Sequence, residues 1–243
     1  TEGFFFGLSG RWQFLWWRYG NAGEVILEKG DIFNIPTGIF RGFENIGDSY
    51  GMLMAILGGD DAGGGVIWAP EVLLEAKKHG LILSEKGKIY DTLKGQKIPN
   101  NENSMEILKD DELKKFPEYL TSEVVPNYVA RYLDLHSLSH DNPCAVIGEK
   151  GKIFDKPGFE VEFISEKSFK KDDGFYNKDI VFMPVEGYWS IKSDICDLIL
   201  NPGDTFSLPK HNKYSLEPTK PGMAGIYKVI PTDDMPGSTH RKQ

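Results

Sequence analysis

Residues 30–45 of the chain are GDIFNIPTGIFRGFEN, and the way this stretch divides into two runs indicates the fold class. A Gly-Asp turn leads into a short apolar run, which Pro36-Thr37-Gly38 ends. The run after this break alternates between two faces, so Arg41 and Phe43 share one side of an extended strand. Two short strands around a tight corner are typical of an antiparallel barrel.

The spacing in this stretch, G-x5-P-x-G-x2-R-x3-N, resembles the second signature of the cupin barrels, which has histidine where this chain has arginine. The resemblance implies an all-β fold of the jelly-roll (double-stranded β-helix) type. It places Arg41 at the position of the family's metal-binding histidine. A guanidinium stays charged and offers only donors, so it cannot coordinate a metal ion. We expect Arg41 to recognise a ligand carboxylate or to form a salt bridge with Glu44 or Glu24, with a catalytic role as a third alternative.

The first cupin signature, H-x-H-x3,4-E-x6-G, ends in a glycine, and Gly10 fits that position. Counting back from Gly10 places the glutamate position at Gly3, or at Glu2 if the spacing slips by one residue. The two histidines of the signature would then lie before Thr1. Because the sequence begins inside an expected strand and without methionine, we expect the chain to be truncated there and to lack at least one strand.

An aromatic segment follows Gly10 and is also expected to be a strand. Its alternation puts Trp12 and Phe14 on one face and Leu15 and Trp17 on the other. The rings either fill the barrel core and a face between subunits, or form the wall of an apolar ligand pocket. Since only one face can point into the barrel, we predict that Leu15 or Trp17 contacts another element or subunit, and that the protein is a homo-oligomer.

The second half of the chain repeats the first. Gly203–Pro209 (GDTFSLP) matches Gly30–Pro36 (GDIFNIP), and each proline lies at the same distance from a later Asp-Asp pair. This agreement in motif and spacing indicates an internal duplication. We predict two tandem cupin barrels joined by a partly helical connector. Residues 1–90 would be the N-terminal barrel with a following helix, residues 91–141 the connector with short helices, and residues 142–243 a degenerate C-terminal barrel.

Carrying the cupin signatures over to the second half places its ligand positions at Gly174, Tyr176, Ile180 and Tyr214. None of these is a histidine or a carboxylate, so the resemblance implies a second barrel without metal. The repeat also aligns Pro36 with Pro209, Asp60 with Asp233 and Gly38 with His211. The ligand-binding residues that we predict are Arg41, Phe43, Trp12 and Phe14 in the first barrel, and Tyr176 and Tyr214 in the second.

Composition argues against several classes of function. The 243-residue chain has a net charge of −8 and no basic stripe, which argues against nucleic-acid binding. No apolar run is long enough to span a membrane. Cys144 and Cys196 lie far apart without redox or metal-ligand spacing, which favours reduced thiols and a cytoplasmic location. We expect structural roles for His79, His136 and His140, because none belongs to a set of three ligands.

Two classes of function remain open. In the first, the protein binds a small anionic or aromatic ligand in the first barrel and uses no cofactor. The alternative is a metal-dependent enzyme that resembles the bicupin dioxygenases, with iron or another divalent metal held by histidines upstream of Thr1. The fold itself does not choose between them, because one barrel supports many activities.

Overall fold

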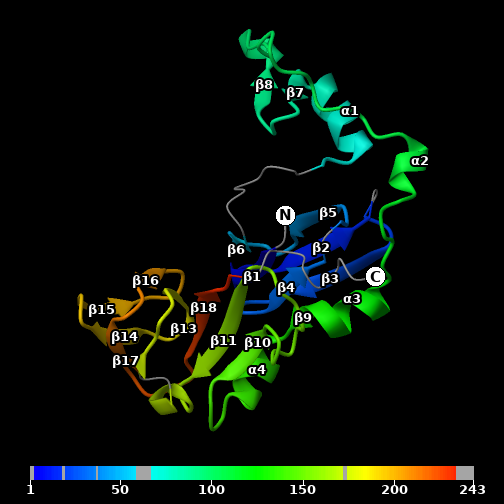
Figure 1. Ribbon diagram of the computed structural model, residues 1–243. Coiled ribbons are helices and arrows are strands. Elements are labelled where there is room, and N and C mark those ends of the chain that lie inside the picture. Colours follow the sequence, from blue (N-terminus) through cyan, green and yellow to red (C-terminus); the bar gives the residue numbers. More distant parts are fainter. Residues whose placement is uncertain (1–2, 18–19, 37, 59–66, 172–173, 234–243) are drawn as a thin grey trace.

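The computed structural model describes residues 3–17, 20–36, 38–58, 67–171 and 174–233. Two β-barrels lie side by side, and a long arm stands away from both of them (Figure 1). No helix in this part of the chain is long and apolar enough to cross a membrane. The predicted all-β class, with helices confined to the connecting segments, is confirmed.

The first barrel is built from two facing sheets. In the sheet of order β6-β1-β4-β9 the strands are β1 (Gly3–Ser9), β4 (Ile32–Ile35), β6 (Met52–Leu57) and β9 (Val129–Ala130). In the sheet of order β3-β2-β5 they are β2 (Trp12–Trp16), β3 (Gly23–Leu27) and β5 (Arg41–Asn45). Apolar side chains from both sheets fill the space between them, with the rings of Phe14 and Phe33 5.5 Å apart. The two runs on either side of Pro36 are therefore β4 and β5, in opposite sheets.

The second barrel also has two sheets. In the sheet of order β10-β11-β18-β13-β16 the strands are β10 (Cys144–Ile147), β11 (Phe159–Ser165), β13 (Ile180–Glu186), β16 (Phe206–Leu208) and β18 (Gly225–Pro231). In the sheet of order β12-β17-β14-β15 they are β12 (Gly174–Phe175), β14 (Trp189–Ser193), β15 (Asp197–Leu200) and β17 (Lys213–Pro218). A short 3-10 helix, η2 (Phe169–Lys171), precedes β12. Phe182 and Trp189 are fully buried between the sheets.

The two barrels repeat each other in register. Gly3 pairs with Ile35 in the first barrel and Ile180 pairs with Leu208 in the second, and in both cases the next residue is the proline of the repeated motif. The expected equivalence of Pro36 and Pro209 is therefore confirmed. Asp60, which the repeat aligns with Asp233, lies outside the described residues.

Local irregularities repeat as well. The pairing of β1 with β6 shifts at Gly7–Ser9, and the pairing of β13 with β18 shifts at Pro184–Glu186. After each bulge a tryptophan indole donates a hydrogen bond to a backbone carbonyl three residues earlier, at 3.0 Å from both Trp12 and Trp189. Bulges interrupt the ladder at defined places, so their agreement supports a duplicated unit rather than a chance likeness of two short motifs.

The arm, which we define as residues 67–116, corrects one predicted boundary. Its helix α1 (Pro70–Lys78) is the helix predicted to follow the N-terminal barrel, and it begins with a proline, which fits the first turn of a helix. It is followed by a hairpin of β7 (Leu81–Leu83) and β8 (Ile89–Asp91), then by η1 (Thr92–Lys94) and α2 (Asp110–Leu113). The predicted boundary between residues 90 and 91 falls inside β8, because the hairpin pairs residues across it.

The remaining connecting segment takes part in both barrels. Helix α3 (Thr121–Tyr128) contacts β3 and β4, and β9 then extends the first barrel's sheet through the pairing of Ile32 with Ala130. Helix α4 (Tyr132–Leu138) contacts β10 and β11 of the second barrel. The predicted connector, residues 91–141, is thus part arm and part barrel wall.

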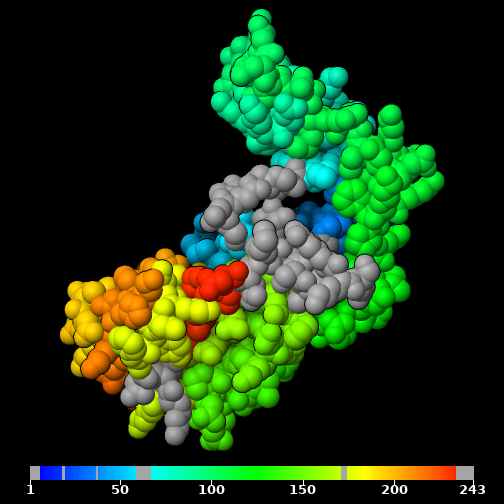
Figure 2. Space-filling view, viewed as in Figure 1, coloured from blue at the N-terminus to red at the C-terminus, as the bar shows by residue number. Residues whose placement is uncertain are grey.

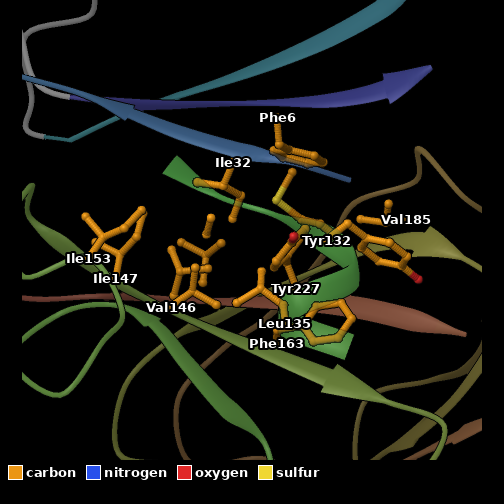
Figure 3. Packing of buried hydrophobic residues seen from close by; sticks show 14 of the residues in the cluster. Phe6, Ile32, Tyr132, Leu135, Val146, Ile147, Ile153, Phe163, Val185 and Tyr227 are labelled. Atoms are coloured by element: carbon orange, nitrogen blue, oxygen red, sulfur yellow. The ribbon is translucent and has the colours of Figure 1, made fainter. Parts of the chain in front are cut away.

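A shared apolar cluster joins the two barrels (Figure 3). Phe6 and Ile32 come from the first barrel, Phe163 and Tyr227 from the second, and Tyr132 of α4 lies with them. The Tyr227 hydroxyl donates to the Gly30 carbonyl at 2.6 Å, and burial raises the pKa of Tyr227 well above its usual value. The phenol therefore stays protonated and holds the two halves together at all ordinary pH values.

The barrels differ at two edges. In the second barrel β17 pairs with β12, and β18 pairs with β11 on one side and β13 on the other. Their counterparts in the first barrel, β5 and β6, are edge strands with no further partner among the described strands. The interior of the first barrel is therefore less completely closed than that of the second.

The outer face of β2 is only half covered within the single chain. Leu15 is half-buried, and Gly20 lies close enough that a Cβ there would be 3.1 Å from Leu15 Cβ. Trp17 is half-buried too, but β2 ends at Trp16 and Trp17 has a φ of +79°, so the alternation predicted for Trp17 does not hold. Part of the contact that we predicted for Leu15 is thus made within the same chain, by the segment at Gly20. The homo-oligomer remains a prediction.

Candidate functional site

The first barrel brings together the four residues that the sequence singled out. Trp12, Phe14 and Phe43 lie on the same face of the β3-β2-β5 sheet, and Phe43 pairs directly with Phe14 across the strands. Arg41 pairs with Trp16 one step further along this face. The ring of Phe43 lies 6.0 Å from that of Trp12 and 5.6 Å from that of Phe14. The predicted alternation, which places Arg41 and Phe43 on one face, is therefore correct within β5.

These four residues differ in how far they are exposed. Phe14 is only 1% exposed and belongs to the core, so it is not the pocket wall that we expected. Phe43 is 52% exposed and Arg41 is exposed as well, because β5 is an edge strand. Together with the half-buried Trp12, Arg41 and Phe43 form an open aromatic and cationic surface, which we call the β5 site.

The guanidinium of Arg41 forms no salt bridge with the carboxylates that the structure describes. Among the described residues no carboxylate lies within 4.0 Å of it, so the expected pairing with Glu44 or Glu24 is wrong. Glu24 instead accepts a hydrogen bond from Gln13 at 2.7 Å. Nearby atoms partly desolvate the guanidinium and lower the pKa of Arg41, but the group remains a cation. An anion that reached this surface would meet a charge that no described carboxylate neutralises.

The second barrel places its two predicted residues around a lysine. The rings of Tyr176 and Tyr214 lie 6.1 Å apart, and Tyr214 is almost fully buried. The Tyr176 hydroxyl accepts a hydrogen bond from Lys228 Nζ at 2.8 Å, and the same ammonium lies 2.6 Å from Glu162 Oε2. Sequence reasoning missed Lys228, although the alternation of β18 places it on the same face as the buried Ile226.

The residues at the cupin ligand positions do not fit a metal ion in the second barrel. Gly174 pairs with Tyr214, so these positions do converge, but they supply phenol groups and no imidazole. The nearby ammonium of Lys228 would also repel a dication. In the first barrel Arg41 occupies the histidine position and Glu2 lies outside the described residues. Nowhere in the described part of the chain do three histidine, cysteine or carboxylate side chains come together in a metal-binding group.

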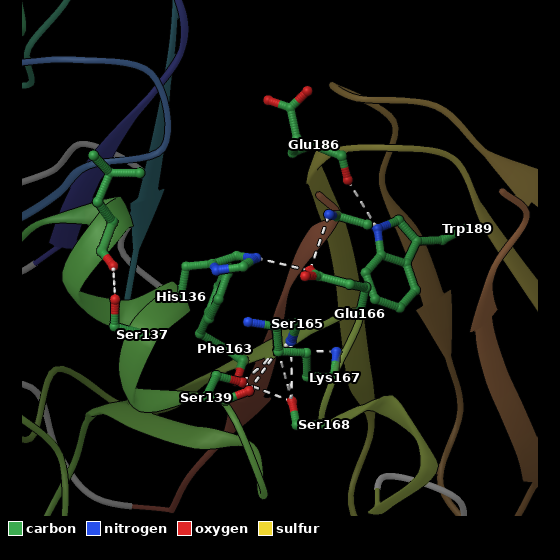
Figure 4. Close-up of polar contacts among 12 residues, drawn as sticks. His136, Ser137, Ser139, Phe163, Ser165, Glu166, Lys167, Ser168, Glu186 and Trp189 are labelled. Carbon is green, nitrogen blue, oxygen red and sulfur yellow. Dashed lines mark hydrogen bonds and ion pairs between the residues drawn. The ribbon is translucent and has the colours of Figure 1, made fainter. Parts of the chain in front are cut away.

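Three of the described histidines, His79, His136 and His140, each pair with a single carboxylate. His136 Nε2 lies 2.7 Å from Glu166 Oε2, next to a group of buried serines (Figure 4). Although burial opposes it, hydrogen bonds from the Ala224 backbone and from His136 lower the pKa of Glu166. His79 lies 3.2 Å from Glu75, and His140 lies beyond the end of α4, beside Asp141. His136 and His140 do not share a helix face, and each histidine has a local structural contact.

Two clefts lie outside the predicted sites. A polar cleft of about 330 Å³ lies beside the ends of β11 and β18 and is lined by Asp155, Lys156, Glu160 and Lys178 among others. An apolar groove of about 470 Å³ runs along the arm, where Leu73, Leu81 and Ile107 contribute to it. Figure 2 shows the arm standing clear of the barrels. Its base is attached through Phe40 and Phe116, whose rings are 5.1 Å apart.

Comparison with known proteins gives structural likeness only. No family model matches the sequence, and no curated protein matches it either. Among solved structures, oxalate decarboxylase matches with a TM-score of 0.54 at 11% identity, over 96% of this chain and 63% of that one. A mutant of salicylate 1,2-dioxygenase from Pseudoaminobacter salicylatoxidans matches with a TM-score of 0.51 at 13% identity, over 95% of this chain and 64% of that one. The chain thus spans a little under two thirds of the length of these neighbours, and both likenesses run through its two barrels.

Proposed function

We propose, starting from the bicupin fold of this chain, that the first barrel binds a small organic carboxylate at the β5 site and that this binding needs no metal ion. The observation that supports the proposal most directly is the Arg41 guanidinium. It is exposed, it has no carboxylate partner among the described residues, and it shares a sheet face with two aromatic rings.

The chemistry of the β5 site suits an anion that carries an apolar body. A guanidinium presents parallel N–H groups that match the two oxygens of a carboxylate. Phe43 offers an exposed ring beside it, and Trp12 packs edge-on against that ring. Aromatic surface of this kind contributes apolar contact area for a ligand ring or chain. An aromatic carboxylate is therefore the ligand class that we propose.

A metal-dependent enzyme is the competing function. The two structural neighbours are named as an oxygenase and a decarboxylase, which motivates the comparison but says nothing of this chain's activity. Arg41 weighs against a metal in the first barrel, because its charge would repel a dication placed at the same position. Metal content therefore belongs in the experiment that tests the proposal.

The test measures binding of benzoate and of its uncharged analogue benzamide to the wild-type protein and to Arg41→Met. Removing a charged hydrogen bond costs about 1.5–3 kcal/mol, so benzoate should bind about ten- to a hundredfold more weakly to the variant. Benzamide binding should not change. Arg11→Met is the matched control, because Arg11 is also exposed but already pairs with Glu28 at 2.8 Å.

Two results would contradict the proposal. Equal benzoate affinity in wild type and Arg41→Met would remove Arg41 from ligand recognition. Stoichiometric iron in the purified wild-type protein, with benzoate binding lost on chelation, would favour the metal-dependent enzyme instead.

A further inference from the structure

The interior of the second barrel contains a charged side chain of its own. Lys228 is 0% exposed, and its ammonium contacts Glu162 at 2.6 Å and the Tyr176 hydroxyl at 2.8 Å. The ammonium also lies 4.6 Å from the centre of the Tyr176 ring, where a cation is attracted by the π electrons. A buried lysine is stable only when such partners replace the water that it has lost.

The strand registers fix where this charge lies. Lys228 is directly opposite Glu162 on β11 and Phe182 on β13, in the middle of the five-stranded sheet. Ile226, two residues earlier on the same face, belongs to the core inside the second barrel. The ammonium therefore points into that barrel, toward the positions that the cupin resemblance assigns to metal ligands.

We propose that Lys228 supplies the second barrel with a fixed cation where a cupin with complete signatures holds a metal ion, and that this barrel consequently excludes metal. The ammonium neutralises the Glu162 carboxylate and occupies the Tyr176 hydroxyl, the two oxygen groups that would otherwise attract a dication. A dication placed beside an ammonium in a poorly screened interior is strongly repelled.

The first barrel has no lysine at the position that corresponds to Lys228. The paired residues Phe5 and Ala55 correspond in register to Phe182 and Lys228, so the equivalent of the lysine is a small exposed alanine. The first barrel instead carries the exposed cation Arg41 on β5. The two barrels have therefore diverged: one presents an accessible charge, and the other encloses a neutralised one. This inference does not depend on the ligand proposed for the first barrel.

The test combines unfolding with Mn²⁺ binding, followed by electron paramagnetic resonance. We expect Lys228→Met, which leaves Glu162 without this cation, to lower the midpoint of urea unfolding more than the double variant Lys228→Met/Glu162→Gln does. We also expect Lys228→Met to bind Mn²⁺ more strongly than the double variant does, because only the single variant leaves the Glu162 carboxylate without a compensating charge. Wild type and Glu162→Gln should bind the same amount of Mn²⁺, because Glu162 holds no metal.

The proposal is overturned if wild type binds Mn²⁺ and Glu162→Gln or Tyr176→Phe abolishes that binding. It is also overturned if Lys228→Met is as stable as wild type. Should Lys228→Met fail to fold, Lys228→Arg keeps the charge and Glu162→Gln removes its partner. Lys228→Arg should then be more stable than Glu162→Gln, and both should bind as much Mn²⁺ as wild type. A Glu162→Gln variant that is more stable than Lys228→Arg would contradict the proposal.

Discussion

His211 adopts a backbone conformation that normally belongs to glycine. The repeat aligns it with Gly38, and the two residues have φ angles of +68° and +80°. Each lies two residues after the proline of the repeated motif, at the corner between two sheets. The second barrel thus has the same backbone at this corner without the glycine, and its His211 ring lies 5.6 Å from that of Phe175.

This strain gives a prediction at the scale of one residue. A side chain in the left-handed region costs about 1–2 kcal/mol, so His211→Gly should be more stable than His211→Ala by about 1 kcal/mol. Both variants lose the ring contact, which makes the comparison a matched one. The measurement is the free energy of unfolding in urea. Gly38→Ala serves as the reference, because a Cβ there meets only Pro117 Cδ at 3.8 Å and the cost is that of the backbone alone.

At the scale of elements, the open edges β5 and β6 set the first barrel apart. Their counterparts β17 and β18 pair on both sides. The backbone N–H groups on the unpaired edges of β5 and β6 should therefore exchange with deuterium much faster than the N–H groups at the same positions of β17 and β18. Hydrogen exchange resolved by mass spectrometry or NMR measures this. Equal protection of β5 and β17 would show that another strand covers β5 in solution, as an assembled homo-oligomer would do.

The elements also show what the sequence could predict. Motif and spacing located β4, β5 and β16, because tight corners need particular residues at fixed positions. The hairpin β7-β8 was not expected, since Leu81–Leu83 is a short apolar run whose partner is fixed only by tertiary packing. The two-residue strand β9 was missed for the same reason.

The candidate site was predicted less completely than the fold. Alternation placed Arg41, Phe43 and Trp12 on one face, but it gave no information on burial, so Phe14 was taken for a pocket residue. Lys228 belongs to no motif: the alternation of β18 places it on the inward face with Ile226, but only the register of β18 against β11 shows that it lies opposite Glu162. Pairing between distant strands is a property of the folded chain, which a pattern along one strand does not contain.

At the scale of the whole molecule, the shared cluster makes the two barrels one cooperative unit. Phe163, Tyr227 and Phe6 pack together, with ring centroids 5.3 Å apart for Phe163–Tyr227 and 5.5 Å for Phe6–Tyr227. Separating the barrels would expose these rings and break the hydrogen bond from Tyr227 to Gly30. Neither barrel can therefore lose its structure without exposing apolar surface on the other.

We therefore expect a single calorimetric unfolding transition for both barrels, with calorimetric and van't Hoff enthalpies that agree. Phe33→Leu makes a cavity in the first barrel alone. It should lower the midpoint of urea unfolding by the same amount whether unfolding is followed at β14 in the second barrel or at β2 in the first. Phe163→Ala, at the junction, should cost about 3–5 kcal/mol and weaken this coupling. Phe182→Ala, buried inside the second barrel only, is the matched control that should cost a similar amount and leave the coupling intact. Two resolved transitions in the wild-type protein would show instead that the junction holds two independent domains.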